Sequence, residues 1–354
     1  MTQSKPHDTL TPAAEDWLIW LSDPSPVREP PRYSLQPREL PLLFKAAEMH
    51  GTLPSCLTKL KRSGIAELIV EKNAGEVRAA VDTWAERGVE LVAVQMNLDY
   101  HGQRAERALQ QAGLAFLRVK GKTFADRLYP TPGLRGYTDV DLLIPVQQRE
   151  LVSAALSSLG FQYHAMKYRQ GEDYFEDKWV IIQGAQEVLI EVHGNLVHNP
   201  RLRRYSSLDY ADVLEAGGGE GSDATALLLV AGTHGAASHQ FDRLQHVVDV
   251  LQCARGAAGV IDTQRLHSVT ERRGLTFAII AALYLAGRTF GEPRCTEIIR
   301  SLAPRAFDSL ASHLLSGRMV IAAQSSARAA MSWRRKAFRQ ALRFSGRRTR
   351  ATRA

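Results

Sequence analysis

The chain has 354 residues, 45% of them hydrophobic and 23% charged, which is typical of a soluble globular protein of two or three domains, or of one core with large helical additions. No apolar run approaches the roughly 20 residues that cross a bilayer, and the polar, acidic N-terminus lacks the pattern of a signal peptide. The three cysteines lie far apart, which excludes a disulfide framework and a zinc knuckle. We therefore expect a cytoplasmic protein.

The net charge of +8 is concentrated at the C-terminus, because nine Lys and Arg residues and no acid follow Trp333. The rest of the chain sums to about −1, so its charge does not indicate a nucleic-acid-binding body.

Proline and polar residues dominate residues 1–37. We expect this segment to form a flexible, poorly ordered arm that Trp17 and Trp20 could dock onto the body. Residues 38–112 carry apolar side chains at helical spacing, with breaks at glycines, and we expect a helical segment there.

Short apolar runs replace the helical pattern in residues 113–205. The expected strands are residues 114–119, 140–144, 161–168, 179–183 and 187–193, and the expected helices are residues 123–129 and 146–159. A glycine-containing turn joins the last two strands as a hairpin. We therefore expect an α+β fold, in which a small mixed sheet is flanked by N- and C-terminal helical segments.

Residues 206–330 return to helical spacing, and we expect a helical domain. Four polar residues recur in it at the spacing of one helix face: His239, Asp242, His246 and Asp249. They could form a metal site of the hydrolase type, but ligands ten residues apart on one helix are about 15 Å apart, too far for one ion. We expect instead that Asp249 and Arg243 form a buried polar tie to the α/β core.

Residues 331–354 combine an apolar stripe with surrounding arginines, which predicts a basic amphipathic helix. Such a tail could bind nucleic acid, an anionic membrane surface or an acidic partner through residues 333–354. The alternative is a solvated tail that docks through Trp333 alone.

The residues with the clearest chemistry lie at the start of the strand expected at residues 140–144. Asp139 and Asp141 point to the same side, because side chains alternate along a strand. Two neighbouring carboxylates repel each other, and a hard divalent cation relieves that repulsion. Glu191 follows a buried apolar run and could lie beside them as a third acid. His193 would share its face, as a core or supporting residue.

Three motifs then carry a resemblance to a known family. They are Lys120-Gly121 and Arg135 before Asp139-Val140-Asp141-Leu142-Leu143, then Glu191-Val192-His193, then His234-Gly235 with Arg243-Leu244 and Asp249. Over about residues 105–251 the chain resembles the uncharacterised bacterial nucleotidyltransferase family of the polymerase-beta-like superfamily. Two positions depart from its pattern: Lys122 stands where the superfamily has Gly or Ser, and His246 where relatives often carry Trp.

The resemblance implies the transfer of a nucleoside monophosphate from a nucleoside triphosphate to an unidentified hydroxyl acceptor, with release of pyrophosphate. Asp139, Asp141 and Glu191 would hold Mg²⁺ (or Mn²⁺), and Glu191 would also help to deprotonate the acceptor. The nucleotide would be bound by residues of the first motif: Lys120, Gly121, Lys122, Thr123 and Arg135. The alternative is a non-catalytic nucleotide- or partner-binding protein on the same fold, acting through its basic C-terminal tail.

Overall fold

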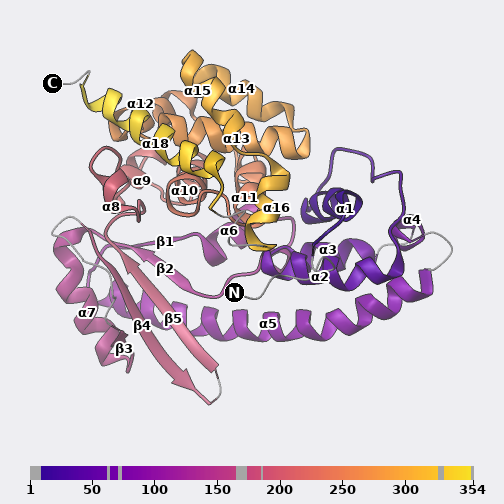
Figure 1. Cartoon of the computed structure of the whole chain (residues 1–354). Coiled ribbons are helices and arrows are strands. Elements are labelled where there is room, and N and C mark those ends of the chain that lie inside the picture. Colours follow the sequence, from indigo (N-terminus) through magenta and orange to yellow (C-terminus); the bar gives the residue numbers. More distant parts are fainter. Residues whose placement is uncertain are drawn as a thin grey trace.

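The computed structural model describes residues 9–61, 64–70, 74–164, 174–184, 186–325 and 331–351. Figure 1 shows a mostly helical molecule in which a five-stranded mixed sheet lies beside N-terminal helices and below a larger group of C-terminal helices. The expected α+β fold, a small mixed sheet flanked by helical segments, is confirmed.

The sheet has the strand order β1-β2-β5-β4-β3. β2 pairs with β5 in parallel, and the other neighbouring pairs are antiparallel. The strands are β1 (Leu117–Val119), β2 (Val140–Leu143), β3 (Gln162–His164), β4 (Glu176–Gln183) and β5 (Gln186–His193). Of the strand expected at residues 161–168, the last part, residues 165–168, lies outside the described residues.

Side-chain alternation gives the central strands two different faces. Val140, Leu142 and Ile190 belong to a buried apolar cluster together with residues of α5 (Ala74–Gln111) and α7 (Arg149–Ser158). Residues one position away along β2 and β5 therefore face the other side of the sheet, toward the C-terminal helices. This second face is where the acidic residues lie.

Residues 9–37 differ from the expected loose arm, because they contain helix α1 (Pro12–Ser22). Residues 38–112, where a helical segment was expected, hold α2 (Leu40–Met49), α3 (Leu53–Leu60) and α4 (Ile65–Ile69), followed by the long helix α5 that continues beneath the sheet (Figure 1). Thr11 caps α1, and Trp17 is fully buried, with its Nε1 donating to the Tyr33 carbonyl at 2.8 Å. The proline-rich composition thus did not indicate that this segment contains a helix packed into the main core.

The C-terminal helices surround a buried apolar helix, α13 (Thr276–Phe290). Helix α6 (Gly121–Leu128) lies between β1 and β2 in the chain and packs against the C-terminal helices, whereas α8 (Pro200–Arg203) and α9 (Tyr210–Ala216) follow β5 and lead into them. The others are α10 (Ala224–Thr233), a π-helix (His234–His239), α11 (Leu244–Ala254), α12 (Thr263–Arg273), α14 (Pro293–Ser301), α15 (Ala306–Ala311), α16 (Gly317–Ser325) and α18 (Trp333–Ala351). In the described part of the chain, no helix has the length and apolar character that a membrane crossing requires.

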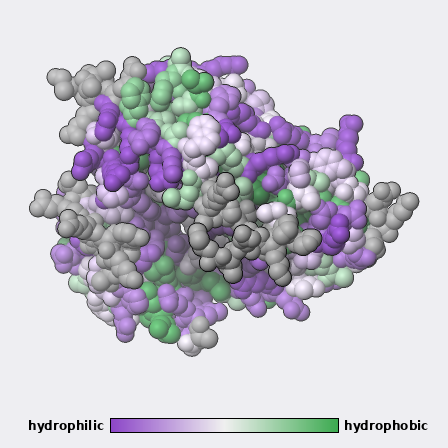
Figure 2. Space-filling view, in the orientation of Figure 1, coloured by the Kyte–Doolittle hydropathy of each residue, from purple (hydrophilic) through white to green (hydrophobic). Residues whose placement is uncertain are grey.

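The basic C-terminal segment forms helix α18, which packs on the body. Phe338 is fully buried, and its ring centroid lies 5.6 Å from that of Phe277 in α13. Trp333 is 72% exposed, so the idea that the tail docks through Trp333 alone is wrong. Figure 2 shows hydrophilic side chains gathered over α18 on its outer face.

Candidate active site

Two acidic residues meet where β2 and β5 pair in parallel. Asp141 lies opposite Glu191 in the register, and both side chains are buried. Ligand atoms of Asp141, Glu191 and His193 lie within 4.8 Å of one another. The structure therefore places Glu191 beside Asp141, on the face of the sheet that is turned toward the C-terminal helices.

Asp141 and Glu191 are each paired with a lysine. Lys120 Nζ lies 2.6 Å from Asp141 Oδ1, and His193 Nε2 lies 2.9 Å from the same oxygen. Burial alone would raise the pKa of Asp141, but Lys120 and His193 hold that pKa below its usual range. Lys178, on the neighbouring strand β4, forms an ion pair with Glu191. Local positive charge thus keeps Asp141 ionised in a buried position.

Asp139 stands just before β2 and lacks such a partner. Within the described residues, its carboxylate has neither a hydrogen bond nor an ion pair with another side chain. Burial raises the pKa of Asp139 to about 7, and the negative charges of Asp141 and Glu191 contribute to this rise. The charge of Lys120 opposes this rise, and the site therefore holds one buried carboxylate without a direct cationic partner among the described residues.

The Lys120–Gly121 turn packs directly against the backbone of Asp139. Both residues have positive φ, 58° and 38°, at the start of α6. A Cβ built on Gly121 would lie 3.5 Å from the Asp139 carbonyl oxygen. This close turn places the Lys120 ammonium group over the carboxylates.

Arg135 is buried and braces this turn. Its Nε and Nη2 donate to the two carboxylate oxygens of Asp249 in α11, both at 2.8 Å, and its Nη1 donates to the Gly121 carbonyl at 3.1 Å. Tyr129 donates a further hydrogen bond to Asp249. A polar tie from Asp249 to the core is therefore present, but its partner is Arg135 and not the expected Arg243. The predicted contact of Arg135 with phosphate stays a prediction.

The side chains of Lys122 and Thr123 contact residues outside the cavity wall. Lys122 Nζ lies 2.9 Å from Asp126 Oδ2 and 3.7 Å from Asp99 Oδ2. Thr123 Oγ1 donates to the Arg118 carbonyl at 2.8 Å. Neither residue lines the cavity beside the carboxylates. The structure thus does not bring these two residues of the predicted nucleotide-binding set to the acidic cluster.

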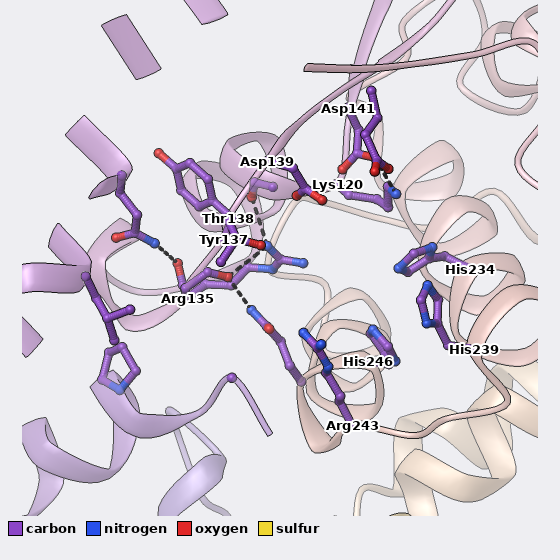
Figure 3. A pocket seen from close by; sticks show the side chains of 18 of the residues that line it. Lys120, Arg135, Tyr137, Thr138, Asp139, Asp141, His234, His239, Arg243 and His246 are labelled. Carbon is purple, nitrogen blue, oxygen red and sulfur yellow. Dashed lines mark hydrogen bonds and ion pairs between the residues drawn. The ribbon is translucent and has the colours of Figure 1, made fainter. Parts of the chain in front are cut away.

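A cavity of 380 Å³ joins the carboxylates to the C-terminal helices. Figure 3 shows Asp139, Asp141 and Lys120 on one side of it and three histidines on another. The histidines and the further basic residues on its wall are His198, His234, His239, His246, Lys178, Arg135 and Arg243. The cavity is thus polar, with the carboxylates and their lysine partners on one wall and the histidines on the facing wall.

The sequence did not predict the histidine wall, the part of the cavity formed by His234, His239 and His246. The sequence interpretation placed His239, Asp242, His246 and Asp249 on one helix, and this is wrong, because the π-helix ends at His239 and α11 begins at Leu244. Gln240 and Phe241, with φ of 52° and 51°, separate the two helices. The nearest signal in the sequence was the His234-Gly235 motif, which predicted no approach to His246.

A family model described as uncharacterised nucleotidyltransferase matches residues 36–291, well over half of the chain. The chain belongs to this family. The match covers all five strands, the carboxylates and the histidine wall, whereas α18 lies outside it. Comparisons with curated proteins and with solved structures found no match.

The acidic residues of this nucleotidyltransferase fit a hard divalent cation. Carboxylate oxygens are the ligands that Mg²⁺ and Mn²⁺ prefer. Asp139, Asp141 and Glu191 all line the cavity, and Asp139 has no direct ion-pair partner among the described residues. His193 holds Asp141 from within the sheet, as a supporting hydrogen-bond partner does in many metal sites.

Proposed function

We propose that this nucleotidyltransferase moves a nucleoside monophosphate from a nucleoside triphosphate to a hydroxyl acceptor and releases pyrophosphate. The observation that carries the proposal is the convergence of Asp139, Asp141 and Glu191 on one wall of a polar cavity. These three residues would hold Mg²⁺ or Mn²⁺, which when bound stabilises negative charge on the attacking and leaving oxygens. Family membership supports the reaction class.

The side chains of the cavity can also accept the acceptor proton and contact the phosphate oxygens. The acceptor oxygen forms a bond to the α-phosphorus while the bond from that phosphorus to the pyrophosphate oxygen breaks, and the acceptor proton passes to a carboxylate. Glu191 is our candidate acceptor of that proton, since it lines the cavity beside Asp141. Lys120 and Lys178 form ion pairs with the carboxylates. When a bound metal ion neutralises the carboxylates instead, both lysines can contact phosphate oxygens. Arg135 acts on the site through the Gly121 turn.

The alternative is a non-catalytic binding protein. It was suggested by Lys122, which stands where the superfamily has Gly or Ser. In the structure Lys122 pairs with Asp99 and Asp126, away from the cavity, so it leaves the Gly121 turn open. Its presence therefore does not favour loss of activity. Binding of nucleic acid or an anionic surface by the outer face of α18 stays a prediction.

The test is calorimetric titration of the full chain with a panel of nucleoside triphosphates, with and without Mg²⁺. We compare the wild type with the Asp139→Asn/Asp141→Asn double variant, which keeps side-chain size and removes two ligand charges. Asp82→Asn, an exposed position on α5, is the matched control.

Mg²⁺-dependent binding of a triphosphate by the wild type and by Asp82→Asn, lost in the double variant, would support the proposal and identify the donor nucleotide. Release of pyrophosphate in the presence of candidate hydroxyl acceptors would then identify the acceptor. Folded wild-type protein that binds no triphosphate would contradict the proposal.

A further inference from the structure

Three histidines from two helices converge on the cavity wall that faces the carboxylates. Ligand atoms of His234, His239 and His246 lie within 4.8 Å of one another. Their ring centroids are 4.4 Å apart for His234 and His239, 5.0 Å for His234 and His246, and 4.8 Å for His239 and His246. Figure 3 shows the three rings turned toward the same space.

The backbone here is built in an unusual way. His234 and His239 begin and end a π-helix, whose wider turn brings residues five apart onto one face. Gln240 and Phe241 then take left-handed conformations, and the Phe241 amide donates to the Gly235 carbonyl at 2.8 Å. A Cβ on Gly235 would lie 2.5 Å from the Phe241 ring, so only glycine fits there. Because π-helical turns and left-handed residues are costly, such local geometry is frequent at functional sites.

The cluster also has unused nitrogen atoms. Within the described residues, the Nδ1 atom of His234 is buried without a hydrogen-bond partner. Buried polar atoms without partners are uncommon, and each one needs an explanation such as an ion.

The Asp242 carboxylate lies close to two of the rings. Its Oδ1 is 3.4 Å from His246 Nδ1 and 3.7 Å from His239 Nδ1, close enough for a charge interaction, although within the described residues His246 Nδ1 forms no hydrogen bond. An acid next to one ring nitrogen favours metal binding at the other, as in carboxylate–histidine–zinc arrangements.

We propose that His234, His239 and His246 bind one divalent transition-metal ion, of which Zn²⁺ is the best fit, at a site separate from the carboxylates. Three imidazole nitrogens suit Zn²⁺ and similar ions, whereas Mg²⁺ takes oxygen ligands. Ligand nitrogens around a tetrahedral zinc are roughly 3.4 Å apart, so a modest ring rotation completes the site. Three protein ligands leave one position for water or for an atom of a molecule in the cavity.

The charges around the cluster are compatible with a cation. The ammonium group of Lys120, which lines the same cavity, is paired with Asp141 at 2.6 Å, and Asp242 contributes negative charge beside the rings. Since the cluster and the carboxylates line one cavity, the ion would lie where it can bind an anionic group of a substrate.

The test is a titration of EDTA-treated full chain in excess Mg²⁺, with Co²⁺ followed by visible absorption and Zn²⁺ followed by calorimetry. We expect one equivalent of each ion and the strong visible bands of tetrahedral Co²⁺. His239→Gln, a change at the partly exposed ligand, is expected to weaken binding at least a hundredfold. His267→Gln, a partly exposed histidine on α12 outside the cavity, is the matched control and should bind as the wild type does.

Two further variants separate this site from the carboxylates. Asp242→Asn keeps the three ligands and should weaken binding about ten- to a hundredfold. Glu191→Gln should leave Co²⁺ binding unchanged. The proposal is overturned if the wild type binds neither ion in excess Mg²⁺, if His239→Gln binds as tightly as the wild type, or if Glu191→Gln abolishes the Co²⁺ bands. No readout uses a nucleotide, so failure of nucleotide transfer would not affect the outcome.

Discussion

Arg335, near the start of α18, donates to the carbonyl oxygen of Gln240 at 2.6 Å. The same guanidinium group reaches the carbonyls of Phe241 and Met319, both at 3.1 Å. Gln240 and Phe241 are the two left-handed residues that directly follow His239. The C-terminal helix, which lies outside the part of the chain that matches the family, thus fixes the backbone that presents the histidine wall.

Arg335→Ala should therefore destabilise the protein and loosen the histidine cluster. The variant leaves buried carbonyl groups without donors, and we expect a loss of about 2–4 kcal/mol in the free energy of unfolding, measured in urea. Arg343, on the same helix, makes a single 3.5 Å contact, with Gln340, among the described residues, and Arg343→Ala should change the stability by less than about 0.5 kcal/mol. Equal losses of stability in the two variants would show that Arg335 does not stabilise the backbone at Gln240 and Phe241.

The attachment of α18 can be tested at its two aromatic residues. Phe338 is fully buried against Phe277, and Phe338→Ala should cost about 3–5 kcal/mol because it opens a cavity in the core. Trp333→Ala removes a larger but exposed side chain and should change the stability by less than about 0.5 kcal/mol. Urea unfolding of both variants checks this order, and a larger loss for Trp333→Ala would contradict the packing described.

The buried pair of Arg135 and Asp249 should be a major determinant of stability. Asp249→Asn leaves the Arg135 guanidinium in the core without its countercharge, which should cost about 3–5 kcal/mol. The exposed pair of Arg272 and Glu215 is the control, and Glu215→Gln should cost no more than about 1 kcal/mol. Arg135→Met/Asp249→Leu should recover part of the stability lost in Asp249→Asn, since no unpaired charge then remains. If Asp249→Asn is as stable as Glu215→Gln, the ion pair with Asp249 does not contribute to the stability of the buried Arg135 side chain.

The parts of the site that could be predicted from the sequence depend on local patterns. Asp139 and Asp141 share a face because strands alternate, and the apolar run before Glu191 predicted a buried strand that ends in an acid. Their approach required the parallel pairing of β2 with β5. That pairing was not predicted, since strand order is not contained in periodicity, and Glu191 was only expected as a third acid that could lie beside the two aspartates.

The parts that were missed depend on contacts between distant residues. Arg135 and Asp249 are 114 positions apart, and the sequence predicted a buried tie from Asp249 but not its partner, because Arg135 was assigned to phosphate binding. The histidine wall requires a π-helix and two left-handed residues, which helical periodicity cannot indicate. The arm with Trp17 was assigned from its prolines, but the buried face of α1 decided its structure.

The stability of the protein should fall as the pH decreases from about 6.5 to about 4, in part because of His50. This side chain is buried between the N-terminal helices and α11, and its Nδ1 accepts a hydrogen bond from the Leu244 amide. Burial lowers the pKa of His50 to about 4, while Asp242 opposes this shift and Arg243 and His246 add to it. In the unfolded chain the ring binds a proton below about pH 6.5. Between these two values the unfolded state binds more protons, so acid favours unfolding.

His50→Asn keeps an acceptor near the Leu244 amide and removes the titrating group. Its stability relative to the wild type should rise by on the order of 3 kcal/mol as the pH is lowered from 6.5 to 4, because the wild type alone loses the contribution of His50. Urea unfolding at several pH values measures this difference. His267→Asn, at a partly exposed histidine, should give a curve parallel to that of the wild type. A parallel curve for His50→Asn would show that the buried His50 ring does not contribute to the acid sensitivity.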